Sequence, residues 1–279
     1  RGLTSEQVGS LETADLVQLG TAAVAALSSG SLVGLASEQV AALLTTQVAA
    51  LGTSQAAGLT DEQTANLTSA GAKALSTGVM SLLGTAAVAA LTTEAVAALG
   101  TAQVNALSST QFGSLTTDQV VALTTGQAKA LGAAQARGLT SEQVGALSTD
   151  NVAQLSTAAV SALSAGALEG LDADRAQALS STQVGALTTE QLTALTTEQV
   201  ATLGSDEAAG LTTGDDHRDL WILLAWWVLL WIGPVQGLRR EQGRQAFAPL
   251  AQRGRGRHQL HRRRHLRRVV SRPRDAARA

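Results

Sequence analysis

Leucine recurs at every eighth position from Leu3 to Leu211, without an exception. We letter this octad a to h, with leucine at position a; its consensus is L-T-T-E-Q-V-A-A. Eight residues exceed two turns of an α-helix by about 80°, so the leucines of one continuous helix would wind around its whole surface. A single long helix would bury no leucine face, and the period therefore excludes it.

Each octad carries the signals that start a new helix. Position b is Thr, Ser, Gly or Asp in 24 of 27 octads, and position e is Gln in about half of them. A hydroxyl at b and a Gln at e form a capping box, in which each side chain bonds the backbone N–H of the other residue. The sequence predicts such boxes at three clear pairs: Thr4 with Gln7, Thr60 with Gln63, and Thr188 with Gln191.

Two further features agree with a helix that restarts in every octad. Acidic residues such as Glu6, Asp61 and Glu190 fall in the predicted first turn, where the helix dipole favours negative charge. Some octads have glycine at b, which predicts a left-handed end to the preceding helix. These glycines include Gly20, Gly52, Gly84 and Gly100. We therefore expect a helix of about two turns, from position c to the next position a.

The apolar positions define the buried side of each predicted helix. Position f is apolar almost throughout, with Thr64 as the main exception, and it lies three residues before the next leucine, as Val8 does before Leu11 and Val40 before Leu43. Position h is usually Ala, Gly or Ser, which permits close packing. Position g varies freely, so we expect it to face water; it includes Lys73, Lys129, Arg137 and Glu169.

One octad cannot fold alone, because two buried side chains contribute roughly 2–3 kcal/mol each and ordering eight backbones costs roughly 8–16 kcal/mol. Stability must come from stacked coils. We predict an all-α solenoid of short helices over residues 1–218, from 27 octads, with two or three octads per coil. A β-solenoid is the alternative, although apolar residues five and three apart do not alternate as a strand requires.

The octads resemble repeat tracts of very large proteobacterial surface or secreted proteins. The resemblance rests on the L-T/S-x-x-Q-V-x-A pattern of Leu115–Ala122 and on its close variants Leu91–Ala98, with Ala95 in place of Gln, and Leu187–Ala194, with Leu192 in place of Val. Such proteins are identified as adhesins or haem-utilisation/adhesion proteins, which implies a surface or secreted location. The chain begins within an octad, at Arg1, and we expect it to be part of a longer protein.

The charges argue against nucleic-acid binding by the repeats. Residues 1–214 carry 17 acidic and 5 basic side chains, and an acidic surface repels phosphate. The stretch Leu115–Leu123 also resembles the opening helix of TAL-effector repeats, which recur at a much longer interval and carry a base-reading loop. Neither feature is present, so we do not expect the repeats to read DNA.

Residues 219–238 form a candidate transmembrane helix. Leu220 to Ile232 is uncharged and apolar, and an extension to Leu238 gives 19 residues, close to the roughly 20 that a membrane-spanning helix needs. Asp215, Asp216 and Asp219 precede the segment, and Arg239 and Arg240 follow it. The positive-inside rule then predicts a cytoplasmic arginine side, with the repeats outside. An interfacial segment is the alternative.

Residues 239–279 carry 14 arginines and no lysine, which predicts a basic disordered tail. The arginines could attract anionic lipid or nucleic acid. His258, His261 and His265 share a helix face, but the arginines around them would repel a metal cation. The octads stop abruptly near residue 214, so a shifted reading frame is a second interpretation of residues 215–279.

We predict no catalytic, cofactor-binding or metal-binding residues, because residues 1–216 contain no His or Cys and their acidic residues do not converge. Asp172 and Asp174 lie near a helix start, which explains them. The leading functional hypothesis is therefore a non-enzymatic stalk or spacer of a surface adhesin. The alternatives are a binding platform for a protein or glycan, and a soluble fragment of a larger secreted protein. A platform predicts clustered, unusual residues at position g of neighbouring coils, such as Lys129 and Arg137.

Overall fold

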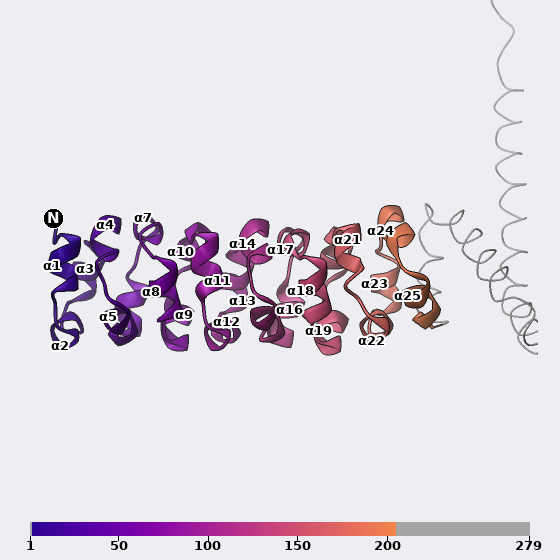
Figure 1. Ribbon diagram of the computed structural model, residues 1–279, viewed down its shortest axis with the longest axis horizontal. Helices are drawn as coiled ribbons and strands as arrows, with labels where there is room; N and C mark the ends of the chain where they lie inside the picture. Colours follow the sequence, from indigo (N-terminus) through magenta and orange to yellow (C-terminus); the bar gives the residue numbers. More distant parts are fainter. Residues whose placement is uncertain (1, 205–279) are drawn as a thin grey trace, which may run out of the picture. The chain divides into compact units, whose positions relative to one another are not determined.

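The computed structural model describes residues 2–204, which form 25 short α-helices and, within this range, no strand (Figure 1). Each helix begins at position c and ends at position f, g or h. The prediction of a helix restarted in every octad is confirmed, and the β-solenoid is wrong for these residues. The predicted hydrophobic helix at 219–238, the tail at 239–279 and the last octads before residue 218 lie outside the described residues.

The capping boxes form as predicted. Thr4 and Gln7 cap α1 (Ser5–Gly9): the Gln7 backbone N–H donates to Thr4 Oγ1 at 3.2 Å, and the Thr4 N–H donates to Gln7 Oε1 at 2.9 Å. The boxes at Thr60 and Thr188 are also present. Each box satisfies two backbone donors that the first turn of a helix leaves without an intrahelical acceptor.

The helices end earlier than we predicted, because the leucine at position a lies outside them. Leu43, for example, adopts φ −57° and ψ 133°, which turns the chain at a corner after only six helical residues, Ser37–Ala42. The predicted left-handed glycines are also wrong: Gly20, Gly52, Gly84 and Gly100 all have extended backbone conformations. The extended leucine followed by an extended b residue makes the turn, so no left-handed residue is needed.

Three octads make one coil of the solenoid. Each helix packs against the helix three places later along the chain, from α1 with α4 to α22 with α25, so the chain returns to the same side after every third octad. The helices therefore form three parallel stacks, which we call the first, second and third stack. The sequence left two or three octads per coil open, and the helix contacts select three.

The first stack contains α1 (Ser5–Gly9), α4 (Ser29–Leu32), α7 (Thr53–Ala56), α10 (Thr77–Leu82), α13 (Thr101–Ala106), α16 (Thr125–Ala130), α19 (Thr149–Gln154), α22 (Ala173–Gln177) and α25 (Thr197–Thr202). The second stack contains α2 (Thr13–Leu16), α5 (Ser37–Ala42), α8 (Asp61–Ala65), α11 (Thr85–Ala90), α14 (Ser109–Gly113), α17 (Ala133–Gly138), α20 (Thr157–Ala162) and α23 (Ser181–Val184). The third stack contains α3 (Thr21–Ala25), α6 (Thr45–Ala49), α9 (Ser69–Ala74), α12 (Thr93–Ala98), α15 (Thr117–Val121), α18 (Ser141–Ala146), α21 (Ala165–Leu168) and α24 (Thr189–Ala194).

One continuous apolar core lies between the three stacks. It contains the leucines of position a and the residues of position f, as predicted, with Phe112 as its largest side chain. Thr64, the polar exception at f, is also fully buried, and its hydroxyl donates to the Ala87 carbonyl at 2.8 Å. The structure adds a third buried position, e, which is filled by Gln in many octads and by small or apolar residues in others.

Glycines at position h bring neighbouring coils into backbone contact. A Cβ atom built on Gly138 would lie 2.0 Å from the carbonyl oxygen of Ser109, and one built on Gly170 would lie 1.9 Å from that of Ser141. No side chain fits at such distances. The prediction that h must be small for close packing is thus explained at these octads by the contacts of α14 with α17 and of α18 with α21.

Candidate functional site

Position e holds the polar group that sequence reasoning missed. Gln55 shows the arrangement: its Oε1 accepts the Gly52 backbone N–H at 2.7 Å, as a capping box requires. Its Nε2 donates to the carbonyls of Val24 at 2.9 Å and Leu27 at 3.0 Å. These carbonyls belong to the preceding coil. One buried amide therefore caps its own helix and joins two coils, and we call this arrangement an amide staple.

The same acceptor recurs along the solenoid: a donor at position e bonds the carbonyl of the corner leucine in the preceding coil, as Gln55 bonds that of Leu27. The glutamines that do so are Gln39, Gln47, Gln55, Gln63, Gln103, Gln111, Gln119, Gln127, Gln135, Gln143, Gln183, Gln191 and Gln199. Three other residue types at e reach the same kind of acceptor: Ser31, Asn151 and Arg175.

The sequence contained a signal for this role. Gln occupies e in many octads, whereas Glu, which satisfies a capping box equally well and suits the first turn better, does not occur at e in the described residues. Only the amide supplies a donor. Its buried position explains the choice, because a carboxylate would be desolvated and would face carbonyl oxygens. All of the bonds that the Gln55 staple makes go to backbone groups, so the staple serves the fold.

The basic side chains predicted at position g are exposed, but the structure does not bring them together. Lys73 lies on α9 of the third stack, Lys129 on α16 of the first and Arg137 on α17 of the second. Lys129 and Arg137 are neighbours in the octad series, yet successive octads lie on different sides of a three-helix coil. The clustering that would favour a binding platform is therefore not made by these residues.

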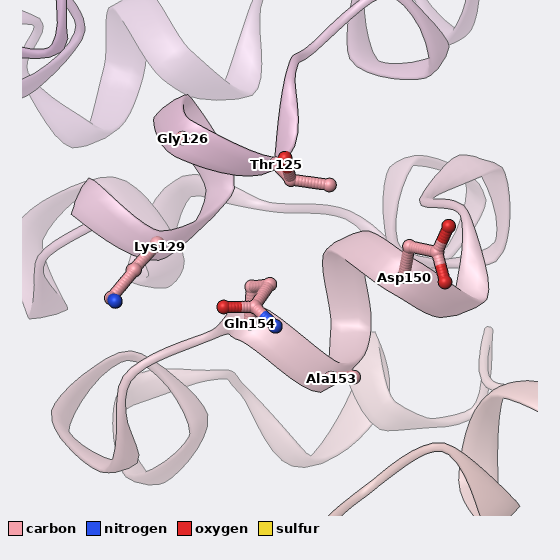
Figure 2. A pocket seen from close by; sticks show the side chains of 6 residues that line it. All are labelled: Thr125, Gly126, Lys129, Asp150, Ala153 and Gln154. Atoms are coloured by element: carbon pink, nitrogen blue, oxygen red, sulfur yellow. The ribbon is translucent and has the colours of Figure 1, made fainter.

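A shallow hollow of about 420 Å³ lies between α16 and α19 of the first stack. It is lined by Thr125, Gly126, Lys129, Asp150, Ala153 and Gln154. In Figure 2 the Gln154 side chain lies between those of Lys129 and Asp150, which are at opposite sides of the hollow. Because it is open and its two charges stand apart, the hollow offers no convergent group for acid–base or nucleophilic chemistry.

The acidic residues have local roles at helix starts. Asp172 caps α22 by accepting the Arg175 backbone N–H at 2.9 Å, and it forms an ion pair with the Arg175 side chain. Asp61 accepts the Glu62 N–H at 3.0 Å. At Glu94 on α12, hydrogen bonds from its own backbone N–H and from the hydroxyls of Thr92 and Thr93 lower the pKa of the carboxyl group.

Within residues 2–204, no three His, Cys, Asp or Glu side chains are grouped as metal ligands. The same part of the chain contains no helix with the length and apolar character needed to cross a membrane. The segment Leu220 to Leu238, predicted as the membrane contact, lies outside the described residues.

Comparison with known protein families finds a similarity to one repeat family in three stretches of the chain. The ALTTAQ repeat family matches residues 8–45, 96–125 and 125–157. Searches of curated proteins and of solved structures found no match. The matched stretches cover octads of all three stacks, and in these stretches the chain is similar to the ALTTAQ repeat.

Proposed function

We propose that the solenoid is a non-enzymatic stalk or spacer of a bacterial surface adhesin. The observation that carries this proposal is the separation of its exposed basic residues: Lys73, Lys129 and Arg137 lie on three different stacks. A binding platform needs unusual side chains on neighbouring coils of one stack, whereas a spacer needs only a soluble surface. The resemblance of the octads to adhesin tracts supplies the proposed location.

The polar groups of the solenoid support a role without chemistry. The buried glutamines are engaged at both ends, with Oε1 on a backbone N–H and Nε2 on backbone carbonyls, as in Gln127. A neutral amide engaged in this way leaves no free N–H for a substrate. The acidic residues at helix starts are exposed, and residues 2–204 contain no His or Cys that could act with them.

Residues 220–238 would serve as the anchor of the stalk, with the solenoid outside the membrane and the arginines inside. The uncharged run from Leu220 to Ile232 and the arginines that follow it support this part of the proposal. We expect the full chain to enter the detergent phase on phase separation. Recovery in the aqueous phase contradicts the anchor. Sequencing of codons 205–225 separates this result from a shifted reading frame.

Antibodies against residues 93–130 test the location. We expect them to label intact cells of the organism that encodes the chain; labelling only after permeabilisation contradicts a surface stalk. The absence of a ligand-binding role is tested by replacing Lys73, Lys129 and Arg137 with Gln in the full protein. A stalk leaves cell adhesion unchanged, whereas a loss of adhesion with normal surface labelling supports a binding platform instead.

A further inference from the structure

The amide staples are interrupted in one stretch of the solenoid. Position e of α9, α10, α11 and α12 is occupied by Gly71, Val79, Ala87 and Ala95, and all four residues are buried. None of their side chains can donate a hydrogen bond. The corresponding carbonyls of the preceding coil belong to leucines at four consecutive corners, and here they face a side chain without a donor. These leucines are Leu43, Leu51, Leu59 and Leu67.

The interruption leaves one whole coil without amide staples, because three octads make one coil. The helices α9, α10 and α11 belong to the third, first and second stack, so every corner of that coil is affected. A second interruption at α20 and α21 is only partial. There Asn151 and Arg175 bond leucine carbonyls from the neighbouring octads, and Ser156 Oγ donates to Leu131 at 3.2 Å.

The core also becomes thinner at this junction. The helices α7, α8 and α9 place Ala56, Thr64 and Ala72 at position f. The preceding coil has Leu32, Val40 and Val48 there, and Met80, Val88 and Val96 follow. These smaller side chains each bury less apolar surface than those of the coils on either side, although α8 and α11 still pack closely. The buried bond from Thr64 to Ala87 is the one hydrogen bond from position f that crosses here.

We propose that the junction between α5–α8 and α9–α12 is a built-in hinge, at which the solenoid opens before any other described coil. In a linear array each coil is stabilised only by its neighbours, so local opening begins at the weakest interface. Opening here divides the array into two blocks, one ending at α8 and one beginning at α9, because the staples of α13–α16 bond carbonyls in and just after α9–α12. The inference rests on the hydrogen bonds and the core, and is independent of the stalk role.

Hydrogen exchange of the full protein, followed by mass spectrometry, tests the hinge. We expect backbone amides of α9–α12 to exchange about tenfold faster than those of α13–α18, because the loss of each hydrogen bond changes an opening equilibrium severalfold. Equal protection in the two stretches, or slower exchange in α9–α12, overturns the proposal.

Restoring two staples provides the matched variant. Ala87→Gln and Ala95→Gln place amides within reach of the Leu59 and Leu67 carbonyls, and together they should slow exchange in α9–α12 roughly tenfold. The control is Ala86→Gln, one residue away at an exposed position, which should leave exchange unchanged. Unchanged exchange in the double variant, with its circular dichroism intact, contradicts the hinge.

A second variant removes staples in place of adding them, and it tests the hinge even if the added glutamines prevent folding. Replacing Gln111, Gln119 and Gln127 with Ala removes the three amide staples of α14–α16, which is one full coil. A new fast-exchanging junction should then appear between these helices and α10–α12, which lie directly before the acceptor leucines Leu83, Leu91 and Leu99. If exchange there stays slow while the variant is folded, staples do not determine where the solenoid opens, and the proposal fails.

Discussion

The helices α9–α12 and α13–α18 share one apolar core and differ in how their coils are joined. Both stretches bury leucine at position a, but α13–α18 carry Gln at every position e and α9–α12 carry none. The apolar pattern alone therefore produces the same helices in both. The comparison teaches that the core forms the coil, whereas the buried amides add to the strength with which one coil holds the next.

The largest expected loss of stability should be the same in both stretches, because it comes from the shared apolar core. Leu75→Asp, before α10, and Leu107→Asp, before α14, should each destabilise the protein by about 4 kcal/mol or more, because each places a carboxylate in the core. Thermal unfolding followed by circular dichroism measures both. Asn105→Asp, at an exposed position, should have little effect. If it matches Leu107→Asp, the assignment of buried and exposed positions is wrong.

An isosteric substitution separates the staple from the cap. Gln119→Glu on α15 keeps an oxygen for the Thr116 N–H but loses the donors to Ala89 and Leu91, and it buries a charge. We expect a loss of about 3 kcal/mol at neutral pH. Burial raises the pKa of the new carboxyl, so the loss should shrink as the pH falls and the group binds a proton.

The matched control is Gln7→Glu, because Gln7 caps α1 from an exposed position and makes only the cap bond. We expect unfolding by urea at neutral pH to show a change within about 0.5 kcal/mol. An equal loss in both variants would mean that the bonds to the preceding coil do not contribute to stability.

The two stretches also differ at position h, where glycine allows close backbone packing in α17. Gly138→Ala on α17 should cost about 1–3 kcal/mol, since the new Cβ would press on the Ser109 carbonyl. The corresponding position h in α9–α12 holds side chains, including the exposed Leu82, so this constraint does not apply there. As a control, Gly166→Ala in α21 has open space around its Cβ and should stabilise the protein by up to about 1 kcal/mol. Denaturant midpoints compare the two.

The smallest effect concerns Glu94 on α12. Its pKa is lowered in the folded state, so its contribution to stability is present above the unfolded-state pKa and is lost as the pH falls through the lowered value. The group is exposed, so we expect only a slight fall in melting temperature below the unfolded-state pKa, which Glu94→Gln removes. An identical pH profile of the variant and the parent protein would show that the hydrogen bonds at Glu94 do not couple to folding.

Much of the fold could be predicted from the octad itself. The boxes at Thr4, Thr60 and Thr188 are local, because a cap joins residues only three apart, and the burial of f and a follows from their spacing. The number of octads per coil could not be predicted, because nearly identical octads carry no signal of a three-octad period. The role of Gln at e was hidden for the same reason: its acceptors lie a whole coil away, as Val24 and Leu27 do from Gln55.

The candidate site shows the same limit. Lys129 and Arg137 are adjacent octad residues, and only the coil geometry reveals that they lie on different stacks. The error at Gly20, Gly52, Gly84 and Gly100 had another cause. Glycine permits a left-handed conformation but does not require one, and before Gly84 and Gly100 the leucine at position a already turns the chain.

The three-octad coil also constrains how the gene can lengthen or shorten. The octads are near-duplicates, so recombination that gains or loses one unit preserves the core and the register of every staple. It would nevertheless move every downstream surface residue from its stack to the next, as if the remaining solenoid were rotated by a third of a turn. Only gains or losses of three whole octads keep each exposed side chain in line with its former neighbours. Natural length variants that differ by single octads would therefore mark a lineage in which surface alignment is under no selection.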